Sequence, residues 1–143
     1  MKTKQPFVVV PCSGIGKSFG SVSREAAYEL CDILRPDDTK LVALAKLVMG
    51  DPAALAAAAS HPVVTIDGCK HMCASKMVNQ SGGTVVCEVA VLDAFRRHKE
   101  LKPEGIAELN DAGRELARVM AGEVAARLTE SGRQETVKGE NHV

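Results

Sequence analysis

The sequence predicts an α/β fold in which four parallel strands form a small doubly wound sheet, with helices on both faces and a further helix at the C-terminus. Two observations favour this class. Short apolar runs alternate with helical patterns along the chain. The run 7–10 is continuously apolar, and 63–66 is apolar apart from Thr65, as in strands buried on both faces. With right-handed crossovers we expect the strand order 2-1-3-4, which places the first and third strands side by side.

The first half of the chain supplies two of the strands and two helices. A loop rich in Gly and Ser, over 11–20, precedes a helix that is expected from residue 21 or 23 to residue 34. The second strand is predicted over 41–45. Asp51 and Pro52 then provide an N-cap and a first helical residue, so an Ala-rich helix is expected to follow.

The second half begins with the third strand and continues with a short helix over 70–80 and a fourth strand over 84–91. Glu88, between apolar neighbours, indicates an edge strand with one solvated face. Four alternating residues of this strand are expected to share the other face: Val85, Cys87, Val89 and Val91.

Helical spacing returns over 92–101 and 106–128. We therefore assign residues 1–128 to a single α/β domain. Residues 129–143 are polar and are expected to form a disordered tail.

Charge and composition exclude several function classes. The 143 residues include 18 basic and 18 acidic ones, only 3% are aromatic, and Trp is absent. This balance argues against a nucleic-acid partner, which needs a basic or base-stacking surface. No apolar run approaches the roughly 20 residues that cross a bilayer, so we expect no membrane partner. The run 7–10 is too short for a signal peptide, which predicts a cytoplasmic protein. The apolar face of the last helix is compatible with a homodimer, and equally with packing on the sheet.

Five cysteines carry the chemistry that the sequence suggests. In a reducing compartment, clustered cysteines favour metal binding or catalysis over disulfides. Cys12 follows the first strand, Cys69 follows the third, and Cys73 lies one helical turn beyond Cys69. Because ligands bind at the carboxyl ends of the central strands, these three thiols are expected to meet. Cys31 and Cys87 fall at core positions of a helix and a strand and are expected to be buried.

This arrangement predicts a thiolate metal site, with zinc as the expected ion. Two helix N-termini point to the same edge and favour thiolates, and Lys17 adds positive charge there. A structural zinc site has four ligands, and His71 is the nearest candidate for the fourth. Ser13 is expected to line the site without binding the ion. Asp67 is expected to hold the turn after the third strand by accepting backbone N–H bonds, or to orient a metal ligand.

Three segments resemble the DGC-domain family of small bacterial and archaeal proteins. They are Pro11-Cys12-Ser13-Gly14, Arg24-Glu25-Ala26-Ala27, and residues 66–76, whose Asp67-Gly68-Cys69 carries the family's name. The resemblance covers most of residues 7–90 and implies a metal site made by cysteines, without implying a reaction. Many members carry another cysteine after the second strand, where this chain has none. The resemblance therefore implies three thiolates, with water, His71 or a soft ligand in the fourth place.

Three other functions fit parts of the pattern. In a thiol redox or sulfur-transfer protein, Cys12 would attack an electrophile or carry a persulfide, and Cys69 or Cys73 would resolve it. The expected partner is then a small thiol or sulfur ligand. Residues 11–18 nearly spell a phosphate-binding P-loop, with Pro11 in place of the first glycine. They also approach the loop of low-molecular-weight phosphatases, but Ser18 stands where an arginine must hold the oxyanion. The sequence leaves open whether the protein is an enzyme.

Overall fold

A computed structural model describes residues 6–12, 18–68, 71–105 and 108–141, with side chains as far as Glu130. Its centre is a parallel four-stranded sheet in the order β2-β1-β3-β4. The strands are β1 (Phe7–Pro11), β2 (Thr39–Leu41), β3 (Pro62–Asp67) and β4 (Thr84–Ala90). The predicted fold class and strand order are therefore confirmed.

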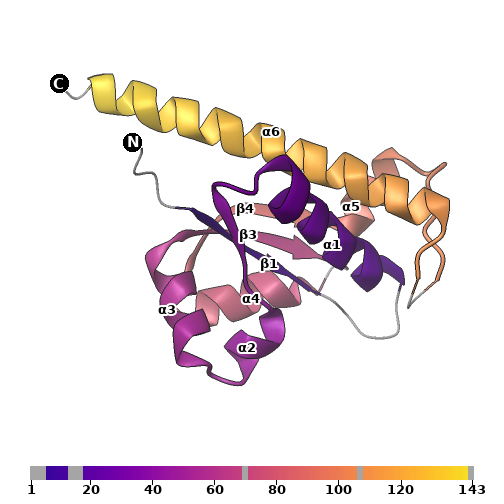
Figure 1. The fold of residues 1–143 in the computed structure, drawn as a ribbon, viewed down its shortest axis with the longest axis horizontal. Helices are drawn as coiled ribbons and strands as arrows, with labels where there is room; N and C mark the ends of the chain where they lie inside the picture. The colour runs from indigo at the N-terminus through magenta and orange to yellow at the C-terminus, as the bar shows by residue number, and fades with distance from the viewer. Residues whose placement is uncertain (1–5, 13–17, 69–70, 106–107, 142–143) are drawn as a thin grey trace.

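Helices cover both faces of the sheet, as predicted (Figure 1). On one face lie α1 (Ser18–Tyr28), the π-helix η1 (Glu29–Leu34), α5 (Val91–Arg97) and α6 (Asp111–Asn141). On the other lie α2 (Leu44–Val48), α3 (Pro52–Ser60) and α4 (Cys73–Gln80). The sheet thus separates two apolar cores.

The valines of β1 serve both cores. Val9 packs in the core under α1 and α6, whereas Val8 and Val10 pack in the core under α2, α3 and α4. All three are fully buried. Successive side chains of a strand point to opposite faces, so a strand covered on both sides must be apolar throughout. Each such burial stabilises the fold by about 1.5–3 kcal/mol.

The second strand and the helix after it differ from the prediction. Strand β2, in which Thr39 pairs with Phe7, ends at Leu41, four residues before the predicted end at residue 45. The chain then forms α2, which the sequence analysis missed. Leu44 and Leu47 lie three residues apart, on one side of this short helix, and Leu47 is 1% exposed. A strand of three residues is too short to show an alternation of apolar and polar residues. The apolar residues at the start of α2 therefore resemble a continuation of the strand.

Strand β4 contains a bulge that the sequence analysis did not predict. Val63 pairs with Val85, but the next residue, Val64, pairs with Cys87. The additional residue, Val86, turns the following side chains to the opposite face. Val85 therefore packs on the α3–α4 side and Cys87 on the α1–α6 side. The prediction that they share a face was wrong, whereas the edge position of β4 is confirmed.

Helix α6 packs against its own sheet. Arg35, held by Asp38, donates from Nη1 to the Ala125 carbonyl oxygen at 3.0 Å and to Thr129 Oγ1 at 2.7 Å. Among the side chains described on α6, Leu128 is the last that is fully buried. The backbone stays helical to Asn141, in the segment for which we predicted a disordered tail. The domain boundary at residue 128 stays a prediction.

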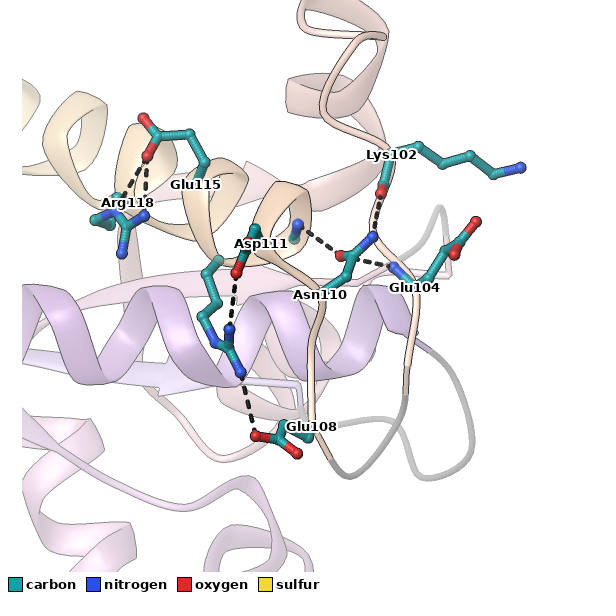
Figure 2. Close-up of polar contacts among 9 residues, drawn as sticks. Lys102, Glu104, Glu108, Asn110, Asp111, Glu115 and Arg118 are labelled. Carbon is teal, nitrogen blue, oxygen red and sulfur yellow. Dashed lines mark hydrogen bonds and ion pairs between the residues drawn. The ribbon is translucent and has the colours of Figure 1, made fainter.

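Asn110 organises the loop before α6 (Figure 2). Its Oδ1 accepts from the backbone nitrogens of Gly113 at 2.8 Å and Glu104 at 3.1 Å, and its Nδ2 donates to the Lys102 carbonyl oxygen at 3.2 Å. The bond from Gly113 is an N-cap, which satisfies a donor of the first helical turn. The Asn110 side chain therefore caps α6 and also links the start of the helix to Lys102 and Glu104.

Candidate functional site

Strands β1 and β3 end together at one edge of the sheet. Pro11 pairs with Ile66, and the N–H of Cys12 donates to the Ile66 carbonyl oxygen at 2.8 Å. Cys12 is therefore level with Asp67, the last residue of β3. The Cys12 side chain is half-buried against the core under α2, α3 and α4.

Asp67 determines where α4 begins. Its Oδ1 accepts from the nitrogen of Ala74 at 2.7 Å, and its Oδ2 accepts from the nitrogen and the hydroxyl of Ser75 at 3.3 and 3.1 Å. Met72, which precedes the helix, has a left-handed backbone with φ of 53° and provides no side-chain cap. A carboxylate from the preceding strand thus satisfies donors that an N-cap residue normally serves. The expectation that Asp67 accepts backbone N–H bonds agrees with this geometry.

The Asp67 carboxyl belongs to a buried polar network. Its side chain is 1% exposed, and the Ser75 hydroxyl lies 2.6 Å from the Thr65 hydroxyl, which is also buried. Burial raises the pKa of Asp67, the bonds from Ala74 and Ser75 oppose this shift, and the negative charge of Glu88 adds to it. The donors of α4 replace the water that the carboxyl loses on burial.

Gly68 allows α1 to approach the turn after β3. A Cβ on Gly68 would lie 3.3 Å from backbone atoms of Phe19 and Gly20. In the same region, Ser23 Oγ donates to the Ile66 carbonyl oxygen at 2.6 Å. That carbonyl also accepts the N–H that follows β1, so it joins β1, β3 and α1. Close packing against α1 therefore favours glycine between Asp67 and the next cysteine.

Cys73 is the first residue of α4, and its side chain is exposed. Its predicted companion Cys69 lies outside the described residues, as do Ser13 and Lys17, so their expected places stay predictions. Over residues 6–12, 18–68, 71–105 and 108–141, no three His, Cys, Asp or Glu side chains gather in a way that would hold a metal ion. Any thiolate site at this edge therefore depends on Cys69.

The other expected residues have simpler environments. His71 is exposed ahead of α4, and its role as a ligand stays a prediction. Cys31 is buried in the core under α1 and α6, as expected, and burial raises the pKa of its thiol. Cys87 is only half-buried at the margin of that core, with its Sγ 4.0 Å from Nη1 of Arg127.

The sequence analysis missed two hydroxyl groups of this edge, those of Ser23 and Ser75. Ser75 donates to Asp67 and completes its network, and Ser23 donates to the carbonyl oxygen of Ile66, near the end of β3. One signal was present: Thr65 is a polar residue inside an otherwise apolar strand, and a buried hydroxyl requires a partner. Its partner lies ten residues further on, and only the folded chain identifies it.

The residues that shape this edge fall within one family match. The model of the DGC domain matches residues 8–112, which is well over half of the 143-residue chain. The chain belongs to the DGC domain family. Comparisons with curated proteins and with solved structures gave no match. The match contains β1 from Val8 onward, the Asp-Gly-Cys segment and α4. It ends in the first turn of α6, so most of α6 lies outside the DGC match.

The described helices of this DGC domain contain no segment that is both long and apolar enough to cross a membrane.

Proposed function

We propose that this DGC domain binds a zinc ion through the thiolates of Cys12, Cys69 and Cys73. The observation that carries the proposal is the pairing of β1 with β3, which makes Cys12 level with Asp67. Cys69 follows Asp67 by two residues, and Cys73 begins the helix that leaves the same turn. Cys12 and Cys73 therefore belong to segments that leave neighbouring strands, and Cys69 lies between Asp67 and Cys73 in the sequence.

The donors at this edge suit a thiophilic ion. Zinc accepts thiolates readily, at distances near 2.3 Å. The buried carboxylate at this edge, Asp67, accepts hydrogen bonds from α4 at both oxygens, which hold it against the helix. The proposed ligands are therefore sulfur atoms, and Asp67 holds the turn that carries two of them. When bound, the ion would link the two segments and polarise whatever occupies its remaining position.

The fourth position is assigned in the proposal to His71, water or a soft ligand. Three protein ligands with an open position are typical of zinc sites that exchange or activate a ligand. This favours a role in handling the metal ion, or a small thiol or sulfur compound, in the reducing cytoplasm.

A thiol redox or sulfur-transfer function is the second candidate. The observation in its favour is that Cys73 is exposed at the first residue of the eight-residue helix α4. Helix N-termini favour thiolates, which attack electrophiles as well as bind metals. In this function Cys12 is the nucleophile, and Cys69 or Cys73 resolves the intermediate.

Metal analysis separates the two candidates. The full chain, purified without added zinc, is expected to carry about one zinc ion per chain by mass spectrometry. The variants Cys12→Ser, Cys69→Ser and Cys73→Ser are each expected to lose it. Cys87→Ser is the matched control, because Cys87 lies in the middle of β4, and it is expected to keep the metal.

Two outcomes would contradict the zinc proposal. One is metal-free protein in which a single thiol reacts much faster than the others, which would support the redox function. The other is metal that persists in all three variants. Cobalt substitution adds a spectroscopic check, since sulfur-to-cobalt charge-transfer absorption should fall with each ligating cysteine removed.

A further inference from the structure

Arg24 is a half-buried cation. Among the described residues, no carboxylate forms an ion pair with it. Its guanidinium donates one long hydrogen bond, from Nη2 to Ser21 Oγ at 3.5 Å. Removing a guanidinium from water is unfavourable unless an anion or several acceptors replace the water. Arg24 belongs to the Arg-Glu-Ala-Ala segment that the family resemblance singled out, and the proposed zinc site makes no use of it.

Arg24 lines a pocket of about 120 Å³ between α1 and the start of α6. A water molecule occupies about 30 Å³ of liquid, so the space suits a group the size of a phosphate or a carboxylate. Ser21, which is 3% exposed, supplies a hydroxyl, and Leu109 closes one side. Arg114 contributes a second guanidinium at the rim.

Two carboxylates also border the pocket, and both are more exposed than Arg24. The Glu108 side chain is 86% exposed and pairs with Arg114 Nη2 at 3.4 Å, as Figure 2 shows. Glu25 is exposed to solvent. Water and salt screen exposed charges far more than half-buried ones. The half-buried guanidinium therefore has the larger influence on a group inside the pocket.

The pocket adjoins the cysteine edge. Ser23, next to Arg24, donates to the Ile66 carbonyl oxygen that also accepts the N–H of Cys12. Gly20, one turn before Arg24, lies against Gly68. One helical turn spans about 5.4 Å, so Arg24 lies close to the residues that carry the proposed ligands.

We propose that this pocket binds a small anionic group, a phosphate or a carboxylate, with Arg24 and Ser21 as its main contacts. A compound that reaches the cysteine edge would then be held by its anionic end. The proposal does not depend on zinc: the anion can bind to a metal-free chain, and zinc can bind without it. A failure of the anion proposal can therefore be distinguished from a failure of the zinc proposal.

Titration of the isotope-labelled full chain with inorganic phosphate, and separately with acetate, tests the proposal at low ionic strength. Saturable changes in the backbone amide spectrum are expected at residues 21–25 and 108–114. Whichever of phosphate and acetate binds with the higher affinity identifies the group that the pocket prefers. In Arg24→Gln the affinity is expected to fall by about tenfold, as for loss of one charge-assisted contact of about 1.4 kcal/mol.

Two further variants test the sign and the location of the effect. Glu25→Gln removes a neighbouring negative charge and is expected to strengthen phosphate binding by about threefold. Arg118→Gln is the matched control, because Arg118 is exposed on α6 and pairs with Glu115 at 3.0 Å, and its affinity is expected to equal that of the wild type. The proposal is overturned if neither anion gives saturable changes, or if Arg24→Gln, folded by the same spectrum, binds as well as Arg118→Gln.

Discussion

The Oδ1 atom of Asp67 lies 2.7 Å from the backbone nitrogen of Ala74, so the last residue of β3 caps the helix that follows the turn. The second oxygen accepts two bonds from Ser75. These three hydrogen bonds therefore tie the end of β3 directly to the start of α4.

Replacing Asp67 by Ala should destabilise the fold. It leaves the buried N–H groups of Ala74 and Ser75 without acceptors, and a buried unsatisfied donor costs about 1–3 kcal/mol. We expect a loss of about 3 kcal/mol in the free energy of unfolding, measured by urea denaturation. Ser75→Ala keeps both backbone bonds to Asp67 and removes only the hydroxyl that contacts Asp67 and Thr65, so it should cost less, about 1–2 kcal/mol. Equal stability of the wild type and Asp67→Ala would refute the capping role.

Gly68→Ala tests the close approach of α1. The new Cβ would lie 3.3 Å from the backbone of Phe19 and Gly20, which have little freedom to move, so a cost of about 1–3 kcal/mol is expected. Gly122→Ala in α6 is the matched control, since nothing lies within 4 Å of its new Cβ. That change should stabilise the helix by about 0.5–1 kcal/mol. Thermal melts of the two variants should therefore shift in opposite directions.

Asn110→Ala should loosen the loop that precedes α6. It removes the N-cap bond from Gly113 together with the bonds to Glu104 and Lys102. A lost cap costs about 0.5–2 kcal/mol, and hydrogen exchange of the first-turn amides of α6 should accelerate accordingly. Asn110→Asp keeps the acceptor and should retain most of the protection. If both variants exchange alike, the cap does not depend on this oxygen.

The buried thiol of Cys31 should make stability depend on alkaline pH. Burial raises its pKa in the folded chain above the ordinary value of 9.0. The unfolded chain then loses its proton first, so the contribution of Cys31 is intact below pH 9.0 and is lost as the pH rises through the higher folded value. The wild type should lose more stability than Cys31→Ala between neutral and alkaline pH. Parallel curves would show that this thiol ionises equally in both states.

The sequence predicted the parts of the fold that burial alone determines. Strands β1 and β3 are covered on both faces, so their valines form uninterrupted runs. Their adjacency is the one expected of a doubly wound sheet with right-handed crossovers, and the observed order agrees with it. That the sulfurs of Cys12 and Cys69 meet at this edge stays a prediction.

What the sequence did not reveal depends on contacts between distant residues. The bulge in β4 arises from its register with Val63 and Val64, and the alternation of apolar residues in β4 shows no break there. The start of α4 is determined by Asp67, six residues before Cys73, rather than by a residue at the usual N-cap position. Helix α2 is five residues long, too short for its spacing to differ clearly from that of a strand.

The family match and the folding unit end at different places. The match stops at residue 112, yet six described residues beyond it are almost fully buried in the core over one face of the sheet: Leu116, Ala117, Met120, Ala121, Val124 and Leu128. A fragment trimmed to the match would leave that face bare and prone to aggregation. Expressing the chain through Leu128 is thus a precondition for testing the edge of the sheet where Cys12 and Cys73 lie.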